Sequence, residues 1–137
     1  MMSDFINEMY EKLKNDEALG AFRFKRENDG HSLGYPIDSV LVVIGSENAD
    51  NMSFLLGYED FEVVGERLVV TVMVNEETGS EFCENCAKTV IGEILKLDDS
   101  KMITGISVEK CMYDKNHFLY KITVKFSLRE FAAAGEG

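Results

Sequence analysis

The chain has 137 residues, enough for one domain that buries a single core without disulfide bonds or metal ions. Its 25 acidic and 14 basic residues give a net charge of −11, which argues against a chain-wide nucleic-acid binder and against adsorption to anionic membranes. No apolar run approaches the ~18 residues needed to span a bilayer, and the opening residues lack a secretory signal. We therefore expect a soluble, acidic, single-domain protein in a reducing compartment.

An amphipathic helix is predicted at the start of the chain. Apolar residues recur at helical spacing from Phe5 to Leu13, Ser3 or Asp4 is a suitable N-cap, and Gly20 is a natural stop. The alternation in Ala21–Arg26 then predicts a short strand, with its two phenylalanines on one side and basic residues on the other.

Two strands are predicted in the middle of the chain. Val40–Ile44 is a continuous apolar run, typical of a strand that is covered on both faces or forms a subunit contact. Gly45 is expected to end this strand, and Ser46–Asn51 is expected to be a polar loop. Arg67–Asn75 predicts a further strand in which neither face is strongly polar.

A second helix is predicted over Thr78–Lys96. Thr78 and Glu81 have the spacing of a capping box, and a sustained apolar stripe follows. A charged turn over Asp98–Lys101 is expected to end the helix, with the adjacent carboxylates Asp98 and Asp99 both in solvent.

The last predicted elements are two strands: Ile103–Met112 pairs with Phe118–Phe131 across a turn at Asp114–Asn116. The final strand alternates apolar and polar residues, with Phe118 among those expected to face inward. The expected fold is α+β, a mostly antiparallel sheet of about five strands with two amphipathic helices on one face, in the order α-β-β-β-α-β-β. Residues 1–131 form the domain and residues 132–137 a flexible tail.

The pair Cys83 and Cys86 forms a CxxC string that has two possible functions. Together with Cys111 and His117 it supplies residue types that bind zinc, and CxxC is also used in thiol–disulfide exchange. Packing is the preferred interpretation, because both cysteines fall on the apolar stripe of the helix while Cys111 and His117 belong to other elements. His31, the other imidazole, is expected to be solvated. We predict no catalytic residue, no metal and no cofactor.

Three basic residues, Lys121, Lys125 and Arg129, recur at spacing four on the outward side of the last strand. They are interpreted as a solvated sheet face or, alternatively, as a docking site for an acidic patch of a neighbour.

Phe54, Leu55 and Leu56 are three successive apolar residues beside polar loops. A strand there would send Leu55 opposite to its two neighbours, so these residues are expected to be covered by a helix or to form a subunit contact.

The chain resembles the tail terminator (tail completion) proteins of long-tailed bacteriophages and prophages. The resemblance lies in the layout of Phe5–Asp16, Tyr35–Gly45, Leu68–Leu95 and Cys111–Phe131. It implies a non-enzymatic minor tail component, located in the virion tail and in the host cytoplasm during assembly.

In such a protein a ring, commonly of six subunits, caps the tail tube protein and joins it to the head–tail connector protein. Glu47 and Asp50 in the expected loop, and the turn Asn75–Thr78, are candidates for lumen or stacking contacts, since a negative bore repels passing DNA. Another head–tail adaptor, a minor tail protein of another kind and a small cellular protein-binding module are alternatives.

Overall fold

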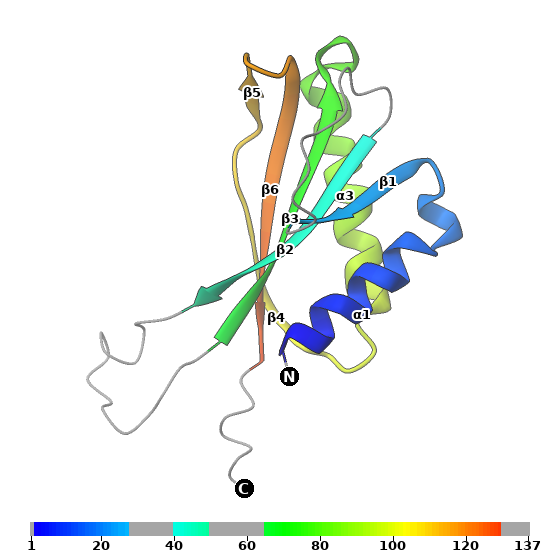
Figure 1. Cartoon of the computed structure of the whole chain (residues 1–137), viewed down its shortest axis with the longest axis vertical. Helices are drawn as coiled ribbons and strands as arrows, with labels where there is room; N and C mark the ends of the chain where they lie inside the picture. The colour runs from blue at the N-terminus through cyan, green and yellow to red at the C-terminus, as the bar shows by residue number, and fades with distance from the viewer. Residues whose placement is uncertain (1, 28–39, 50–64, 130–137) are drawn as a thin grey trace, which may run out of the picture.

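The computed structural model describes residues 2–27, 40–49 and 65–129 as two α-helices, two short 3-10 helices and one six-stranded sheet (Figure 1). The elements are α1 (Met2–Lys14), η1 (Glu17–Leu19), β1 (Phe22–Arg26), β2 (Val40–Ala49), β3 (Gly65–Asn75), η3 (Glu76–Thr78), α3 (Gly79–Leu97), β4 (Ile103–Val108), β5 (Met112–Asp114) and β6 (Leu119–Leu128). Several residues named above lie outside the described residues: His31, Asp50, Phe54, Leu55, Leu56 and the tail at 132–137.

The strands form one mixed sheet in the order β1-β2-β3-β6-β4, and β5 pairs with the beginning of β6. Every neighbouring pair is antiparallel except β1 and β2, which run parallel from Phe22↔Val40 to Arg26↔Ile44. The predicted α+β class and mostly antiparallel sheet are confirmed. The sheet has six strands where about five were expected, because the two strands predicted at the end of the chain are three: β4, β5 and β6.

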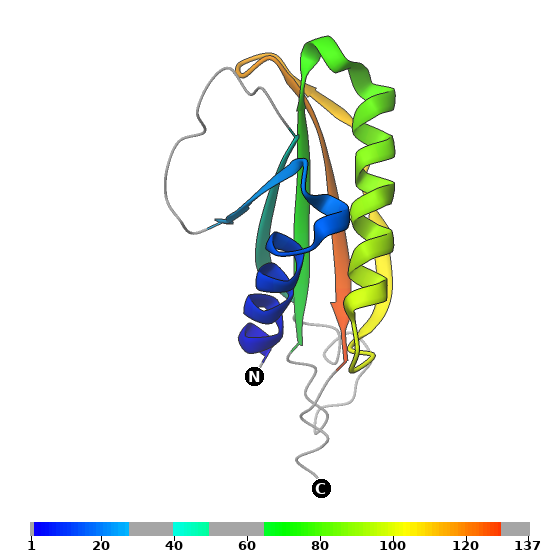
Figure 2. The same cartoon turned by 90° about the vertical axis from the view of Figure 1, so that its right-hand side faces the viewer.

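Both helices pack on the same face of the sheet, as predicted. Alternate residues of β2, β3 and β6 point to this face and are buried with the apolar side chains of the helices. Helix α3 lies along β3 and β6, whereas α1 packs on β1 and β2 and touches α3 (Figure 2). The buried sheet residues of this core are Val40, Val42, Ile44, Leu68, Val70, Val72, Val74, Ile122, Val124, Phe126 and Leu128.

The first helix ends earlier and β2 ends later than expected. Helix α1 begins at Met2 and stops at Lys14, and Gly20 closes the short η1 helix instead. Strand β2 continues through Gly45 to Ala49, so the predicted loop is wrong for residues 46–49, and its last two residues lie outside the described residues. Its polar residues stay in the ladder because the long strand β3 pairs with them as far as Ala49↔Gly65. The side chain of Glu27 lies where a Cβ at Gly45 would project, so any larger residue there requires Glu27 to move.

The predicted capping box of the second helix is also wrong. The Thr78 hydroxyl donates to the carbonyl of Asn75 (2.7 Å) and makes no side-chain cap on α3. The Asn75 side chain instead accepts from the backbone N–H of Glu77 (2.8 Å) and caps the η3 turn. Gly79, at φ +90°, then carries the chain from this turn into α3, a backbone conformation that favours glycine.

The turn after α3 is not fully solvated. Asp99 is exposed, as expected, but Asp98 is buried. The two oxygens of the Asp98 carboxylate accept from the backbone N–H groups of Met102 and Ile103, each at 2.9 Å. This carboxylate therefore joins the end of α3 to the start of β4, and the expected solvated pair is wrong for Asp98.

The last hairpin departs from the predicted pattern at two places. Strand pairing stops after Val108 and resumes at Met112, so the predicted strand Ile103–Met112 is divided into β4 and β5. Phe118 has φ +57° and is 59% exposed, so its side chain does not join the inward row of β6. Leu119 is buried instead, against Leu41 on the opposite face of the sheet.

Candidate functional site

The sheet face opposite the helices carries a row of alternating charges, which we call the charged row: Glu47, Arg67, Lys125 and Glu109. Glu47 accepts from Arg67 on the neighbouring strand at 2.7 Å. The Lys125 amine lies 3.3 Å from the same Glu47 carboxylate and 3.5 Å from Glu109. Two acids and two bases thus neutralise one another across β2, β3 and β6.

The structure brings together two residues that sequence analysis assigned to separate sites. Glu47 was expected in a lumen loop and Lys125 in a basic docking stripe, but they are ion-paired on one sheet face. The other two residues of the predicted basic stripe also have partners within the same chain. Lys121 lies 3.9 Å from Asp114, and Arg129 donates to the carbonyl of Lys101 at 2.9 Å. The docking role of these residues stays a prediction.

The pKa of Glu47 follows from this row. The hydrogen bond from Arg67 holds the pKa of Glu47 below its ordinary value; partial burial opposes this effect and Lys125 adds to it. A lowered pKa in the folded state contributes stability above the unfolded pKa, and this contribution is lost as the pH falls through the folded pKa.

We expect the stability of the Glu47→Gln variant to depend less on acidic pH than that of the wild-type chain. The wild-type free energy of unfolding should fall between about pH 5 and about pH 3 more steeply than that of the variant, and the two should differ by less than about 1 kcal/mol at pH 7. Urea unfolding across this pH range, followed by circular dichroism, measures the slopes. Glu77→Gln, at an exposed position in η3, is the matched control. Equal slopes for wild type and Glu47→Gln would contradict the expected role.

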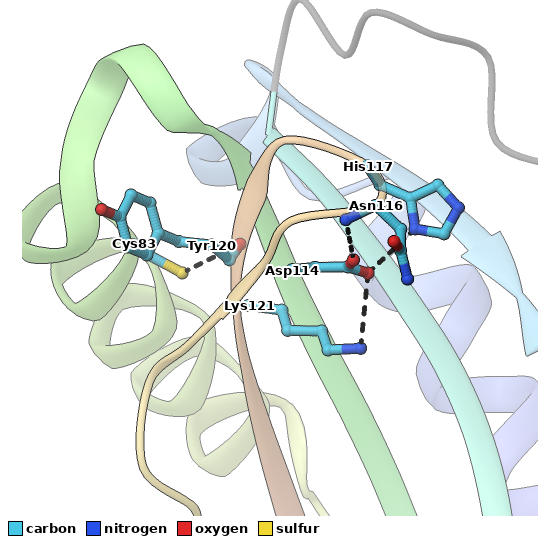
Figure 3. A network of polar contacts seen from close by, with 6 residues as sticks. All are labelled: Cys83, Asp114, Asn116, His117, Tyr120 and Lys121. Carbon is cyan, nitrogen blue, oxygen red and sulfur yellow. Dashed lines mark hydrogen bonds and ion pairs between the residues drawn. The ribbon is translucent and has the colours of Figure 1, made fainter.

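The tip of the β5–β6 hairpin is organised around Asp114 (Figure 3). Its carboxylate accepts from the backbone N–H of Asn116 at 3.0 Å and lies 2.9 Å from Nδ1 of His117. The contact with His117 lowers the pKa of Asp114, and Lys121 contributes in the same direction. These contacts form an Asx-type turn with an ion-pair partner, which holds the tip in shape.

The three cysteines are free thiols, two of them in the core. The Cys83 thiol donates to the carbonyls of Val72 (3.6 Å) and Tyr120 (3.7 Å), as Figure 3 shows for Tyr120. Burial raises the pKa of Cys83 to about 12, and the neighbouring Cys111 thiol adds to the shift. Cys111 therefore lies beside the helix, contrary to expectation, whereas His117 belongs to the hairpin tip. At neutral pH such thiols are protonated and act as small apolar groups, in line with the packing interpretation.

A pair of carboxyl groups lies where η1 meets α3. Asp16 caps η1 by accepting from the backbone N–H of Ala18 at 3.0 Å, while its other oxygen is buried. The neighbouring Asp16 raises the pKa of Glu93, with desolvation acting in the same direction, and Lys96, 3.6 Å away, opposes the shift. A raised pKa in the folded state favours folding at acidic pH, so Glu93 acts in the opposite direction to Glu47 of the charged row.

The outer edge of the sheet at β4 and β5 is apolar, and sequence analysis did not single it out. Among the described residues, five of the seven exposed large apolar side chains lie between 106 and 118: Ile106, Val108, Met112, Tyr113 and Phe118. Both strands pair only with β6 in the described sheet, so their outer backbone groups are open to another strand. We call this surface the apolar edge. In the sequence, the only indication of this surface is that Ile106 and Val108 alternate with polar residues, as in a strand with one apolar face.

Comparison of the sequence with protein-family models finds no match, and no curated protein matches it. Within residues 2–27, 40–49 and 65–129, no group of three His, Cys, Asp or Glu side chains could hold a metal ion. In the same part of the chain, neither helix combines the length and the apolar character needed to cross a membrane.

Proposed function

We propose that this chain is a structural subunit that acts by adhesion to copies of itself and to neighbours, without catalysis. Its role in this proposal is that of a tail terminator of a phage or prophage tail. A ring of subunits, commonly six in the proteins it resembles, caps the tail tube protein and presents a surface to the head–tail connector. The protein works in the virion tail and in the host cytoplasm during assembly.

The observation that carries this proposal is the apolar edge. Val108 is 55% exposed and Met112 58% exposed, on strands whose outer backbone groups are open to a further strand. Exposed apolar side chains along an open sheet edge favour association with another chain. An edge of this kind supports the assembly of copies, because one strand can add to the next without a new pocket.

Charge is the second support. The chain carries 11 net negative charges, while Lys121 and Lys125 have acidic partners within their own subunit. A ring of such subunits is strongly acidic in total, and an acidic bore repels the DNA phosphates that pass through it.

The test is deletion of the gene from the element that carries it, followed by electron microscopy of the particles. Termination requires that the deletion gives overlong tails or tails without heads, and that a plasmid copy of the wild-type gene restores normal particles. Normal virions from the deletion strain would overturn the proposal and favour a cellular protein-binding module. Particles that lack tails altogether would point to another tail component.

A further inference from the structure

The geometry points to a particular partner for the apolar edge: strand β1 of a second copy of this chain, added beside β4 so that the two sheets become continuous. This inference rests on the proposed function only in that both require contact between copies. It names the segment and the residues that would form this contact.

Strand β1 is the opposite end of the same sheet. In the described residues it pairs only with β2, and it has five residues where β4 has six. One copy therefore has a donor edge at β1 and an acceptor edge at β4. Contact between different edges is heterologous, and it produces a ring when the rotation between copies closes.

The apolar residues of the two edges point to the same face of the sheet. In β1, Phe22 and Phe24 lie on the helix side of the sheet, where they are half-buried against the core. In β4, Ile106 and Val108 lie on that same side, opposite Phe126 and Val124 of β6, and are exposed. When β1 of one copy joins β4 of the next with the helices on one side, the phenylalanines cover the exposed aliphatic residues.

The other face of this junction pairs opposite charges. Arg23 and Lys25 alternate with the two phenylalanines and therefore point away from the helices. Glu109 follows β4 on that side; its carboxylate is about half exposed and already receives Lys125 from β6. In a chain with far more acidic than basic residues, this short basic strand complements the single carboxylate of Glu109.

The experiment uses the purified full chain and its self-association, measured by sedimentation velocity from micromolar to millimolar concentration. In this arrangement β1 runs antiparallel to β4, so Arg23 is the basic residue of β1 that lies nearest Glu109. We expect Arg23→Glu to weaken association by roughly 3- to 30-fold, because one exposed pair changes from attraction to repulsion. Glu109→Lys should weaken it to a similar degree, and the double variant should recover most of the wild-type association. Lys88→Glu, on the exposed face of α3, makes the same charge change as Arg23→Glu and should have no effect beyond about twofold.

Hydrogen exchange of the wild-type chain gives a readout that needs no variant. The backbone amides of residues 22–26 and 103–108 should become protected together as concentration rises, while exchange in α3 stays constant. A chain that is monomeric at millimolar concentration, protection of only one edge, or an unrepaired double variant would overturn the inference. A deletion strain with defective tails would still support the proposed function in that event, so the two failures are distinguishable.

Discussion

The variant Asp98→Ala is expected to lose about 3 kcal/mol of unfolding free energy, a large part of the 5–15 kcal/mol typical of a domain. Asp98 is only 5% exposed, and its carboxylate accepts from two backbone N–H groups, those of Met102 and Ile103. Alanine leaves both donors without a partner, one of them buried and the other partly buried. Urea unfolding followed by far-ultraviolet circular dichroism measures the loss, since the chain has no tryptophan.

The adjacent Asp99 provides the control for this result. Its side chain is 81% exposed and pairs with Lys12 at 3.2 Å, a contact of small energetic value in solvent. Asp99→Ala should therefore change the stability by less than about 0.5 kcal/mol. If the two alanine variants were equally stable, Asp98 would not be the connection between α3 and β4 that its contacts indicate.

The second large effect is expected for Phe126→Ala, at about 3–5 kcal/mol. Phe126 is fully buried near the end of β6, within the core that joins the sheet to both helices. Truncation removes apolar contact and leaves a cavity that the rigid sheet cannot close. The same unfolding measurement applies, with an unchanged denaturant slope as the sign that the folded state is otherwise retained.

Phe118→Ala is the matched control, because the same side chain is removed from an exposed position in the same hairpin. We expect a change below about 0.5 kcal/mol. A loss under 1.5 kcal/mol for Phe126→Ala, or a comparable loss for both phenylalanines, would show that the core is not centred on this part of β6.

Sequence patterns predicted the core of this fold because its signal is local. The alternation from Ile122 to Leu128 and the apolar stripe of the second helix each place a row of residues on one face. Both rows contribute to the core, although Phe82 and Leu95 at the margins of the helical stripe are exposed. The same rule failed at Phe118, where a positive φ interrupts the alternation before the strand begins. Alternation describes residues inside a strand and gives no information on where the strand starts.

The residues whose surroundings were predicted wrongly have partners that are distant in the chain. Glu47 and its neighbours have the composition of a loop, but Arg67 and Lys125 stabilise them as part of β2. Asp98 has the same local composition as Asp99, and only the path of the chain into β4 brings amide donors to it. The contact between Cys83 and Cys111 depends in the same way on the return of the chain after β4.

The apolar edge was missed for a different reason. Its exposed residues look like ordinary strand residues in the sequence, and only the strand order reveals that β4 and β5 have no neighbour on one side within the described sheet. An edge is a property of the whole sheet, so a pattern read along one strand does not contain it.

The position of β6 also determines when folding can finish during synthesis. This strand, the last one described, lies inside the sheet and pairs with β3, β4 and β5. A nascent chain on the ribosome therefore holds β2 and β3 without their central neighbour until residue 128 has emerged. Over that interval the apolar side of β3 is only partly buried, because the unit that covers it is still incomplete, and such intermediates are prone to aggregation.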